Sequence, residues 1–279
     1  MVVKVVTDST SDISPEVANA LGITVVPVYV RFGDEVYRDG VDISSDEFYQ
    51  KLTDLFVHPA TSQPTPEDFA RVYSDCAKKA DGIISIHISD KVSGVYNSAL
   101  QGKKMTKGEC QIEVVDSYVT SVGLALTVMA AAKLASAGGS LLEVFEETRR
   151  VISQVYIIGL VNTMKYLVLG RRLNKAAAVA AGILDIKPLL AFKDGEIVRA
   201  GLVHTYSQGI DRLYKFVESN PDIQDLAIAY STEPEQARQL KARLGSCFPE
   251  EDIYVTQLGA GLGVHVGPGG LIVALRRRG

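Results

Sequence analysis

The stretch VVKVVTDSTSDISPEVANALG, residues 2–22, shows the alternation that decides the fold. Val2–Thr7 is a short β-branched run of the kind that forms a buried strand, and a polar loop follows it at Asp8. Ser14-Pro15 predicts a helix start, because proline at the first helical position loses no hydrogen bond, and Gly22 predicts the helix end. A strand that runs through a short loop into a helix is the first half of a βα unit.

The same alternation continues through the first half of the chain. Thr120–Ser136 is apolar on nearly all faces, which is typical of a helix buried on every side. Strands that alternate with helices predict a mainly parallel sheet covered on both faces. The further strands are predicted at Ile23–Val30, Gly82–Ile88 and Gln111–Asp116, and the further helices after Ser44, Thr65, Ser93 and Ser140.

The second half carries a different signal. Lys193-Asp194-Gly195-Glu196 is a hairpin turn between the predicted strands Ile186–Phe192 and Ile197–Val203. A hairpin among βα units predicts a mixed or antiparallel sheet. We therefore predict an α/β protein of two domains, a parallel-sheet domain at residues 1–150 and a mixed-sheet domain at residues 151–279. The other elements of the second half are predicted strands at Tyr156–Val161, Leu226–Tyr230, Ile253–Gln257 and Leu271–Leu275, and helices at Gln208–Val217 and after Thr232.

Composition narrows the function classes. The 279 residues carry a net charge of −4 and are 47% hydrophobic, which is typical of a globular protein without a broad nucleic-acid-binding face. Three scattered cysteines form no metal or redox spacing. The longest nearly unbroken apolar run, Val122–Ala132, is too short to span a bilayer, and the N-terminus has no signal-peptide pattern. We therefore expect a cytoplasmic protein with no integral membrane segment and no nucleic-acid partner.

Hydroxyl-rich segments fall at three predicted strand ends, at residues 8–12, 61–64 and 89–94. Ligands of open α/β sheets bind outside the carboxyl ends of the strands. Helix N-termini offer unpaired backbone N–H groups there, and hydroxyls beside them make an anion site without lysine or arginine. Taken singly, such residues are more often plain helix caps. Their recurrence at one sheet nevertheless favours an anion-binding edge.

A glycine-rich segment, GLGVHVGPGGLIVA at residues 261–274, holds His265 in its middle. It fits no dinucleotide fingerprint, because valine takes the third glycine position and too few residues follow for a βαβ unit, and it fits no Walker A loop. We predict a loop whose glycines let the backbone approach a ligand that His265 faces. The alternative is a half-buried histidine in a tight turn. Of the other histidines, His87 is predicted at a strand core or edge, and His58 and His204 at the surface.

Ser93, His265 and an aspartate could form a nucleophile, base and orienting group, which would make the chain a serine-dependent hydrolase or phosphotransferase. However, the sequence KVSGV around Ser93 is not a G-x-S-x-G elbow, and no His or Cys spacing supports a metal. The residues supply neutral donors and one imidazole, which suits the binding of a single carboxylate or phosphate. On the residues alone, both interpretations stay open.

Five segments lie in order along nearly the whole chain: VTDSTSDI (6–13), TSQPTPEDF (61–69), ISDKVSGVYNSA (88–99), YLVLGRRLNKAAAVAAGILDIKPLL (166–190) and GVHVGPGG (263–270). Together they resemble the DegV family of bacterial fatty-acid-binding proteins. The resemblance implies a DegV-like two-domain α/β fold with the ligand at the domain interface. It also implies the B subunit of fatty acid kinase, which holds a long-chain fatty acid such as palmitate. A separate ATP-dependent A subunit would then phosphorylate the carboxylate for phospholipid synthesis.

By this resemblance, Arg172 corresponds to the arginine of the family's Gly-Gly-Arg-Ile, although Arg171 stands here in place of the second glycine. Arg172 would face the kinase subunit or the acyl phosphate. The chain would be a lipid carrier rather than an enzyme, with no catalytic residue, cofactor or metal of its own. A regulatory module that senses lipid is a further alternative. The residues implied around the carboxylate are Thr61, Ser62, Ser93, Gly94, His265 and Gly267.

An acyl chain would supply most of the affinity for such a ligand. A fatty acid of about 16 carbons carries roughly 14 methylenes, and at ~0.8 kcal/mol each their burial is worth at most about 11 kcal/mol. An exposed ion pair contributes only ~0.2–1 kcal/mol. The apolar segments Leu124–Ala132 and Ile157–Val161 could line a tunnel for the chain, and an ordinary protein core is equally compatible with them.

Overall fold

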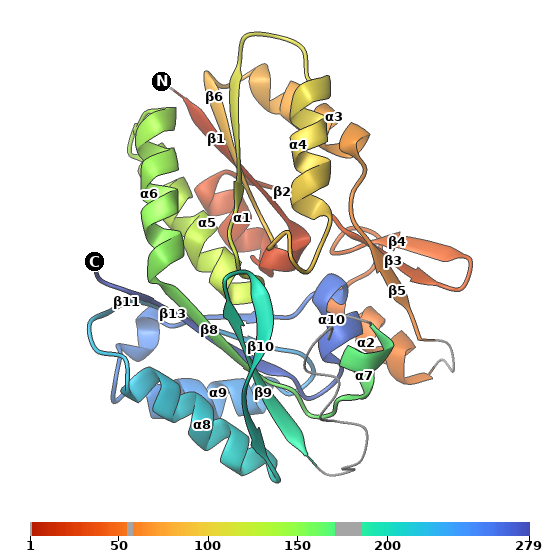
Figure 1. Cartoon of the computed structure of the whole chain (residues 1–279), viewed down its shortest axis with the longest axis vertical. Coiled ribbons are helices and arrows are strands. Elements are labelled where there is room, and N and C mark those ends of the chain that lie inside the picture. The colour runs from red at the N-terminus through yellow and green to blue at the C-terminus, as the bar shows by residue number, and fades with distance from the viewer. Residues whose placement is uncertain (1, 55–57, 171–185) are drawn as a thin grey trace.

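The structure, a computed structural model, describes residues 2–54, 58–170 and 186–279, and Figure 1 shows how its sheets and helices are arranged. The strands are β1 (Val3–Asp8), β2 (Ile23–Val26), β3 (Tyr29–Phe32), β4 (Glu35–Arg38), β5 (Ala60–Ser62), β6 (Gly82–His87), β7 (Gln111–Asp116), β8 (Val155–Leu160), β9 (Lys187–Lys193), β10 (Glu196–Val203), β11 (Ile223–Tyr230), β12 (Tyr254–Gln257) and β13 (Leu271–Arg277). The α-helices are α1 (Pro15–Leu21), α2 (Ser45–Asp54), α3 (Pro66–Ala77), α4 (Val95–Met105), α5 (Ser121–Ser136), α6 (Leu141–Gln154), α7 (Lys165–Leu169), α8 (Tyr206–Glu218), α9 (Pro234–Leu244) and α10 (Ala260–Val266). The short 3-10 helices within the described residues are η1 (Ser9–Ser11) and η3 (Glu250–Asp252).

Four parallel strands form the N-terminal sheet, in the order β2-β1-β6-β7. Val5 of β1 lies between Ile23 of β2 and Ile84 of β6, and all three side chains are buried. Helices α3 and α4 pack on one face of this sheet, and α5 and α6 pack on the other (Figure 1). The predicted parallel sheet with both faces covered is therefore confirmed.

The helix signals of the sequence act locally as predicted. Thr65 and Ser140 form reciprocal capping boxes with Asp68 and Glu143 at the starts of α3 and α6. Gly22 ends α1 in the left-handed region, with φ at 64°. These contacts involve residues at most four positions apart, which is why sequence patterns find them.

The sequence does not predict the third sheet, in which β3 lies between β4 and β5 with antiparallel pairing. The prediction of a single strand at Ile23–Val30 is wrong, because its two halves belong to β2 and β3 in different sheets. Pro27 separates them, since proline has no N–H to give to a sheet ladder. Thr61 lies on β5 opposite Val30, and so belongs to this small sheet rather than to the end of a parallel strand.

Six strands form the C-terminal sheet, in the order β10-β9-β8-β13-β11-β12. Neighbouring strands are antiparallel except β11 and β12, which are parallel. The predicted hairpin joins β9 to β10, and the positive φ angles of Asp194 (52°) and Gly195 (81°) suit a two-residue hairpin turn. Helices α8 and α9 pack on the side of this sheet away from the N-terminal sheet (Figure 1). The chain thus has an α/β fold with a parallel sheet in its N-terminal part and a mixed sheet in its C-terminal part.

Helix α5 lies between the two large sheets, where it packs on β1 and also on β11 and β13. Residues 121–128 are all buried, so the prediction of a helix buried on every side is confirmed for this part of α5, whereas Lys133 and Ser136 near its end are exposed. One hydrophobic core runs from Val5 in the first strand to Ile272 in the last. Because this core crosses residue 150, the division of the chain into residues 1–150 and 151–279 stays a prediction.

Candidate functional site

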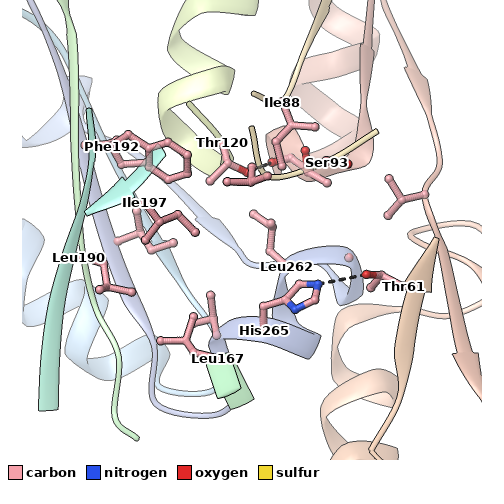
Figure 2. Close-up of a pocket in the computed structure, with 18 of the residues that line it drawn as sticks. Thr61, Ile88, Ser93, Thr120, Leu167, Leu190, Phe192, Ile197, Leu262 and His265 are labelled. Carbon is pink, nitrogen blue, oxygen red and sulfur yellow. Dashed lines mark hydrogen bonds between the residues drawn. The ribbon is translucent and has the colours of Figure 1, made fainter. Parts of the chain in front are cut away.

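A cavity of about 1010 Å³, part of it open to solvent, is bordered by residues of the C-terminal sheet and the small sheet, of α7 and α10, and of the segments that follow strands β1, β2, β6 and β7 of the N-terminal sheet. Figure 2 shows side chains from these elements pointing into one space. Among the described residues that line it, most are apolar, the polar ones are hydroxyls, Gln63 and His265, and none carries a carboxylate, ammonium or guanidinium group. Such a lining suits an apolar ligand with one polar end.

The C-terminal sheet supplies the apolar side of the cavity. Ile272, Gly159 and Leu190 are direct neighbours on β13, β8 and β9, so their side-chain positions share one face of the sheet. Phe192 and Ile197 pair across the hairpin and lie with Leu190 on one side of the cavity (Figure 2). A Cβ atom at Gly159 would come no closer than 3.4 Å to any neighbour. The absence of a side chain at Gly159 therefore leaves open space on the cavity side of β8.

Residues 261–266 of the glycine-rich segment belong to helix α10, so the prediction of a loop is wrong for them, and residues 267–270 connect this helix to β13. The glycines of α10 permit close packing of the helix on the N-terminal part of the chain. A Cβ atom at Gly261 would lie 2.5 Å from Cγ2 of Val28, and one at Gly263 would lie 2.5 Å from Cε1 of Phe48. Tertiary packing thus overrides the low helix propensity of glycine. Gly261 also lines the cavity, together with Leu262, His265 and Val266 of the same helix.

Two buried carboxylates bind the first turn of α10. Oδ1 of Asp12 accepts the Gly259 N–H at 2.8 Å, and Oδ1 and Oδ2 of Asp39 accept the N–H groups of Ala260 at 2.8 Å and Gly261 at 3.1 Å. Burial raises the pKa of both carboxyl groups, strongly for Asp12, while these hydrogen bonds act in the opposite direction. The N–H groups at a helix N-terminus have no intrahelical partner, so both residues stabilise the placement of α10 by accepting these hydrogen bonds.

His265, in the last turn of α10, meets the small sheet at the polar part of the cavity. Its Nε2 lies 3.0 Å from Oγ1 of Thr61, as the dashed line in Figure 2 marks. Ser93, from the segment between β6 and α4, and Thr120, just before α5, line the cavity nearby (Figure 2). The arrangement gathers hydroxyls and one imidazole from four distant segments, which suits hydrogen bonding to an anion without a fixed positive charge.

A chain of buried hydrogen bonds leads from the N-terminal sheet toward this part of the cavity. Oη of Tyr73 donates to Oγ of Ser85 at 2.8 Å, and Oγ of Ser85 lies 2.6 Å from Nε2 of His87. Nδ1 of His87 lies 2.9 Å from Oδ2 of Asp8, whose Oδ1 accepts the N–H of Thr10 at 3.1 Å. Thr10 lines the cavity. Ser85, His87 and Asp8 have no exposed surface, so they position Thr10 and offer no nucleophile to a substrate.

The structure brings four of the predicted site residues to the cavity: Thr61, Ser62, Ser93 and His265. Gly94 and Gly267 do not line it. A Cβ atom at Gly94 would lie 2.6 Å from Nε2 of Gln63, and one at Gly267, where φ is 73°, would lie 2.1 Å from the ring of Tyr166. Both glycines therefore permit close packing beside the site. Arg172 lies outside the described residues.

Other placements differ from the tunnel suggested by the sequence. Ile157, Gly159 and Val161 line the cavity, but no residue of Leu124–Ala132 does, because that part of α5 is buried between the two large sheets. His87 is a core residue as predicted, and His204 is exposed. Sequence reasoning missed the hairpin side chains Leu190, Phe192 and Ile197, whose spacing on one face of two paired strands was the available signal. Across the part of the chain that the structure describes, no helix has both the length and the apolar character to cross a bilayer.

Comparisons with known proteins agree with this geometry. A family model described as "Uncharacterised protein, DegV family" matches residues 2–277. A DegV domain-containing protein of Deinococcus radiodurans is 34% identical over 279 residues, which cover 99% of this chain and 98% of the relative. A fatty-acid-binding DegV family protein from Thermus thermophilus has a solved structure with 33% identity, a TM-score of 0.90 and full coverage of both chains. A stearic-acid-binding protein from Eubacterium ventriosum matches with 27% identity, a TM-score of 0.88 and 98% coverage of both chains.

Proposed function

The chain belongs to the DegV family, and from that premise we propose that it binds a long-chain fatty acid in the cavity. The carboxylate would lie at Thr61, Ser93 and His265, and the acyl tail along the apolar face of the C-terminal sheet. The observation that carries the proposal is one cavity in which a part lined by hydroxyls and an imidazole continues into an apolar part. Relatives that bind fatty acids, one of them stearic acid, support the same ligand class.

The polar part of the cavity suits a carboxylate better than a neutral head group. A carboxylate only accepts hydrogen bonds, and the hydroxyls of Thr61 and Ser93 and the imidazole of His265 can all donate. Such bonds to an ionised group are shorter and about twice as strong as neutral ones. Ser62 would add a further donor from β5. Gly94 and Gly267 would contribute indirectly, by letting Gln63 and Tyr166 pack close to the site.

The carboxylate would then be presented to a separate ATP-dependent kinase subunit. One carboxylate oxygen would attack the γ-phosphorus of ATP, the bond to the bridging oxygen would break, and acyl phosphate and ADP would form. The sequence of this chain has no Walker A or dinucleotide motif, so the nucleotide would be held by the other subunit. Arg172 would face the acyl phosphate or that subunit. The chain itself would act as the carrier.

Mass spectrometry of an organic extract from the purified, denatured protein tests the binding step. A near-stoichiometric fatty acid is expected, and its mass would give the preferred chain length. An extract that stays empty after incubation with mixed fatty acids would contradict the proposal. Adding a fatty acid kinase A subunit and ATP to the loaded protein tests the second step. Retained lipid that never becomes acyl phosphate would favour a lipid-sensing regulatory role instead.

A serine-dependent hydrolase or phosphotransferase remains the competing interpretation. It requires His265 to act as base toward Ser93, whereas Nε2 of His265 is hydrogen-bonded to Thr61. The nearby carboxylates of Asp12 and Asp39 bind the N-terminus of α10, at the opposite end of the helix from His265. Turnover of an acyl or phosphoryl ester by the purified chain alone, abolished in Ser93→Ala, would establish this activity. We expect no such turnover.

A further inference from the structure

Asp39 lies directly after β4, and its side chain is almost wholly buried. Both of its oxygens bind the first turn of α10, at 2.8 Å from the N of Ala260 and 3.1 Å from the N of Gly261. Oδ2 also accepts the hydroxyl of Ser9 at 2.8 Å. Three donors around a buried carboxylate leave it little freedom, and a helix start has no intrahelical partner for these N–H groups.

The backbone of Asp39 ties the same residue to the small sheet. Its N–H donates to the carbonyl of Val28 at 2.9 Å, immediately before β3. Strand β3 pairs with β5 and places Val30 opposite Thr61. Asp39 is therefore joined through its backbone to the strand pair that carries Thr61, and through its side chain to the helix that carries His265.

Helix α10 is short enough to move as one body. His265 lies five residues beyond Ala260, a rise of roughly 7.5 Å along the axis at about 1.5 Å per residue. A change in the direction of the first turn would therefore shift the imidazole relative to Thr61. The close contacts of Gly261 and Gly263 with Val28 and Phe48 restrict sideways movement and leave the N-terminal bonds to fix the remaining tilt.

We propose that Asp39 is a positioning residue that sets the imidazole of His265 against the hydroxyl of Thr61. Its side chain binds the first turn of α10, and its backbone N–H binds Val28, directly before β3. Asp39 thereby fixes the position of the imidazole relative to the hydroxyl. The inference rests on the proposed function, in which these two groups receive the carboxylate. A residue that only stabilised the fold would leave the geometry of the pair unchanged when it was replaced.

Two variants weaken the attachment of the first turn of α10 to residue 39 from opposite sides. Asp39→Asn keeps the side-chain shape but turns an NH₂ group toward one of the N–H donors. Ala260→Pro removes the N–H of the first helical residue, where proline is tolerated in an α-helix, and its ring would displace the Asp39 carboxylate from that N atom. Asp34→Asn is the matched control, because Asp34 is an exposed carboxylate in the turn between β3 and β4. Should Asp39→Asn fail to fold, Ala260→Pro carries the same test.

The probe is palmitate labelled with ¹³C at its carboxyl carbon, with the ¹⁵N shifts of the His265 ring as the second readout. The measurements are made well below the melting temperature of each variant. We expect Asp39→Asn and Ala260→Pro to release palmitate roughly tenfold faster or more than the parent, and to shift both the ¹³C carboxyl resonance and the ¹⁵N ring resonances of His265. The control Asp34→Asn should change neither. In the double variant the increase in release rate should be less than the product of the two single increases, because both variants weaken the attachment of the first turn of α10 to residue 39. A lower melting temperature with unchanged resonances and release rates would overturn the proposal. The proposal would also be overturned if the effects of the two single variants on the release rate of palmitate multiplied fully in the double variant. The His265 shifts are also measured without ligand, so failure of palmitate to bind the parent protein would count against the proposed function and leave Asp39 tested.

Discussion

Nε2 of His265 lies 3.0 Å from Oγ1 of Thr61, although the two residues are 204 positions apart in the chain. One belongs to the last helix and the other to the smallest sheet, and neither element has a strong signal in the sequence. Their hydrogen bond closes the polar part of a cavity whose opposite side is the apolar face of the C-terminal sheet (Figure 2). The pair therefore marks where the head group of a bound lipid is expected.

Replacing His265 should weaken ligand retention more than it weakens the fold. We expect His265→Ala to keep the far-ultraviolet circular dichroism of the parent and to lose fatty-acid affinity by roughly tenfold or more, since a hydrogen bond to a charged group is worth about 1.5–3 kcal/mol. Isothermal titration with palmitate measures the loss. His204→Ala is the control, because His204 is exposed and away from the cavity lining. Equal affinities in parent and His265→Ala would remove His265 from the site.

Filling the space on the cavity side of β8 should shorten the acyl chain that fits. A valine at Gly159 would project into the cavity, since nothing but Ile272 and one carbonyl oxygen lies within 4 Å of a Cβ atom there. We expect Gly159→Val to lower the affinity for an 18-carbon acid by roughly tenfold relative to a 12-carbon acid, or about 1.4 kcal/mol. Competition binding across a chain-length series measures the ratio.

Gly201→Val provides the matched control for that series. Gly201 also lies in the C-terminal sheet, a Cβ atom there would likewise come no closer than 3.4 Å to a neighbour, and the residue does not line the cavity. Its chain-length profile should equal that of the parent. If both valine variants changed the profile equally, the acyl tail would not lie on the cavity side of β8.

The pH dependence of stability should report the buried carboxyl group of Asp12. Burial raises its pKa well above 3.8, so the folded state holds the proton to a higher pH than the unfolded chain does. The contribution of Asp12 to the free energy of unfolding is therefore fully present below the unfolded pKa and declines as pH rises through the folded pKa. We expect Asp12→Asn to give a more positive slope of unfolding free energy against pH, measured by urea denaturation between about pH 4 and 7.

Asp42→Asn serves as the comparison for Asp12→Asn. The pKa of Asp42 is lowered to about 2, chiefly by its hydrogen bonds to Arg38. Its contribution is lost only as pH falls below the unfolded value, so this variant should leave the slope at pH 5–7 unchanged. A parent-like slope in Asp12→Asn would show that the carboxyl group of Asp12 does not titrate abnormally in the folded protein.

A methyl group on Gly263 should destabilise the protein despite the better helix propensity of alanine. Its Cβ atom would lie 2.5 Å from Cε1 of Phe48 and 2.9 Å from Oη of Tyr49, both buried. Overpacking of this kind costs about 1–3 kcal/mol, whereas the gain in propensity is at most ~1 kcal/mol. Thermal denaturation should show a lower midpoint for Gly263→Ala than for Gly123→Ala, where the nearest contacts are at 3.3–3.4 Å. A Gly263→Ala midpoint at or above that of the parent would contradict the packing explanation for α10.

Those parts of the fold that depend on local contacts could be predicted from the sequence. The βα unit at residues 2–22, the capping boxes of α3 and α6 and the Asp194-Gly195 turn all depend on neighbours a few positions apart. The third sheet could not be predicted, because its strands are three or four residues long and too short for a clear alternation. Helix α10 could not be predicted either, because its two internal glycines disfavour a helix until Val28 and Phe48 are packed against it.

In the candidate site, too, the residues that lie in local motifs could be predicted and the residues that depend on distant contacts could not. Thr61, Ser62, Ser93 and His265 were accessible to prediction because each sits in a recognisable motif, and the structure places all four at the cavity, where their contact with a ligand stays a prediction. Asp39 has no motif, and its partners on α10 lie more than 220 positions away. For Leu124–Ala132 the sequence leaves both alternatives open, because an apolar helix has the same pattern whether it faces a cavity or packs between two sheets.

The carboxylates that hold α10 also affect how the protein is completed during synthesis. Asp12 and Asp39 leave the ribosome early, yet their helix partners follow 247 and 221 residues later. Until then, the parallel sheet can pair its strands, but Asp12 and Asp39 lack the backbone N–H donors of α10 and have only hydroxyl donors such as Ser121 and Ser9. A nascent chain released before residue 260 would lack both the imidazole and the helix that carries it. If the proposed function holds, lipid binding would therefore require translation of the last helix, and truncated products would not bind lipid.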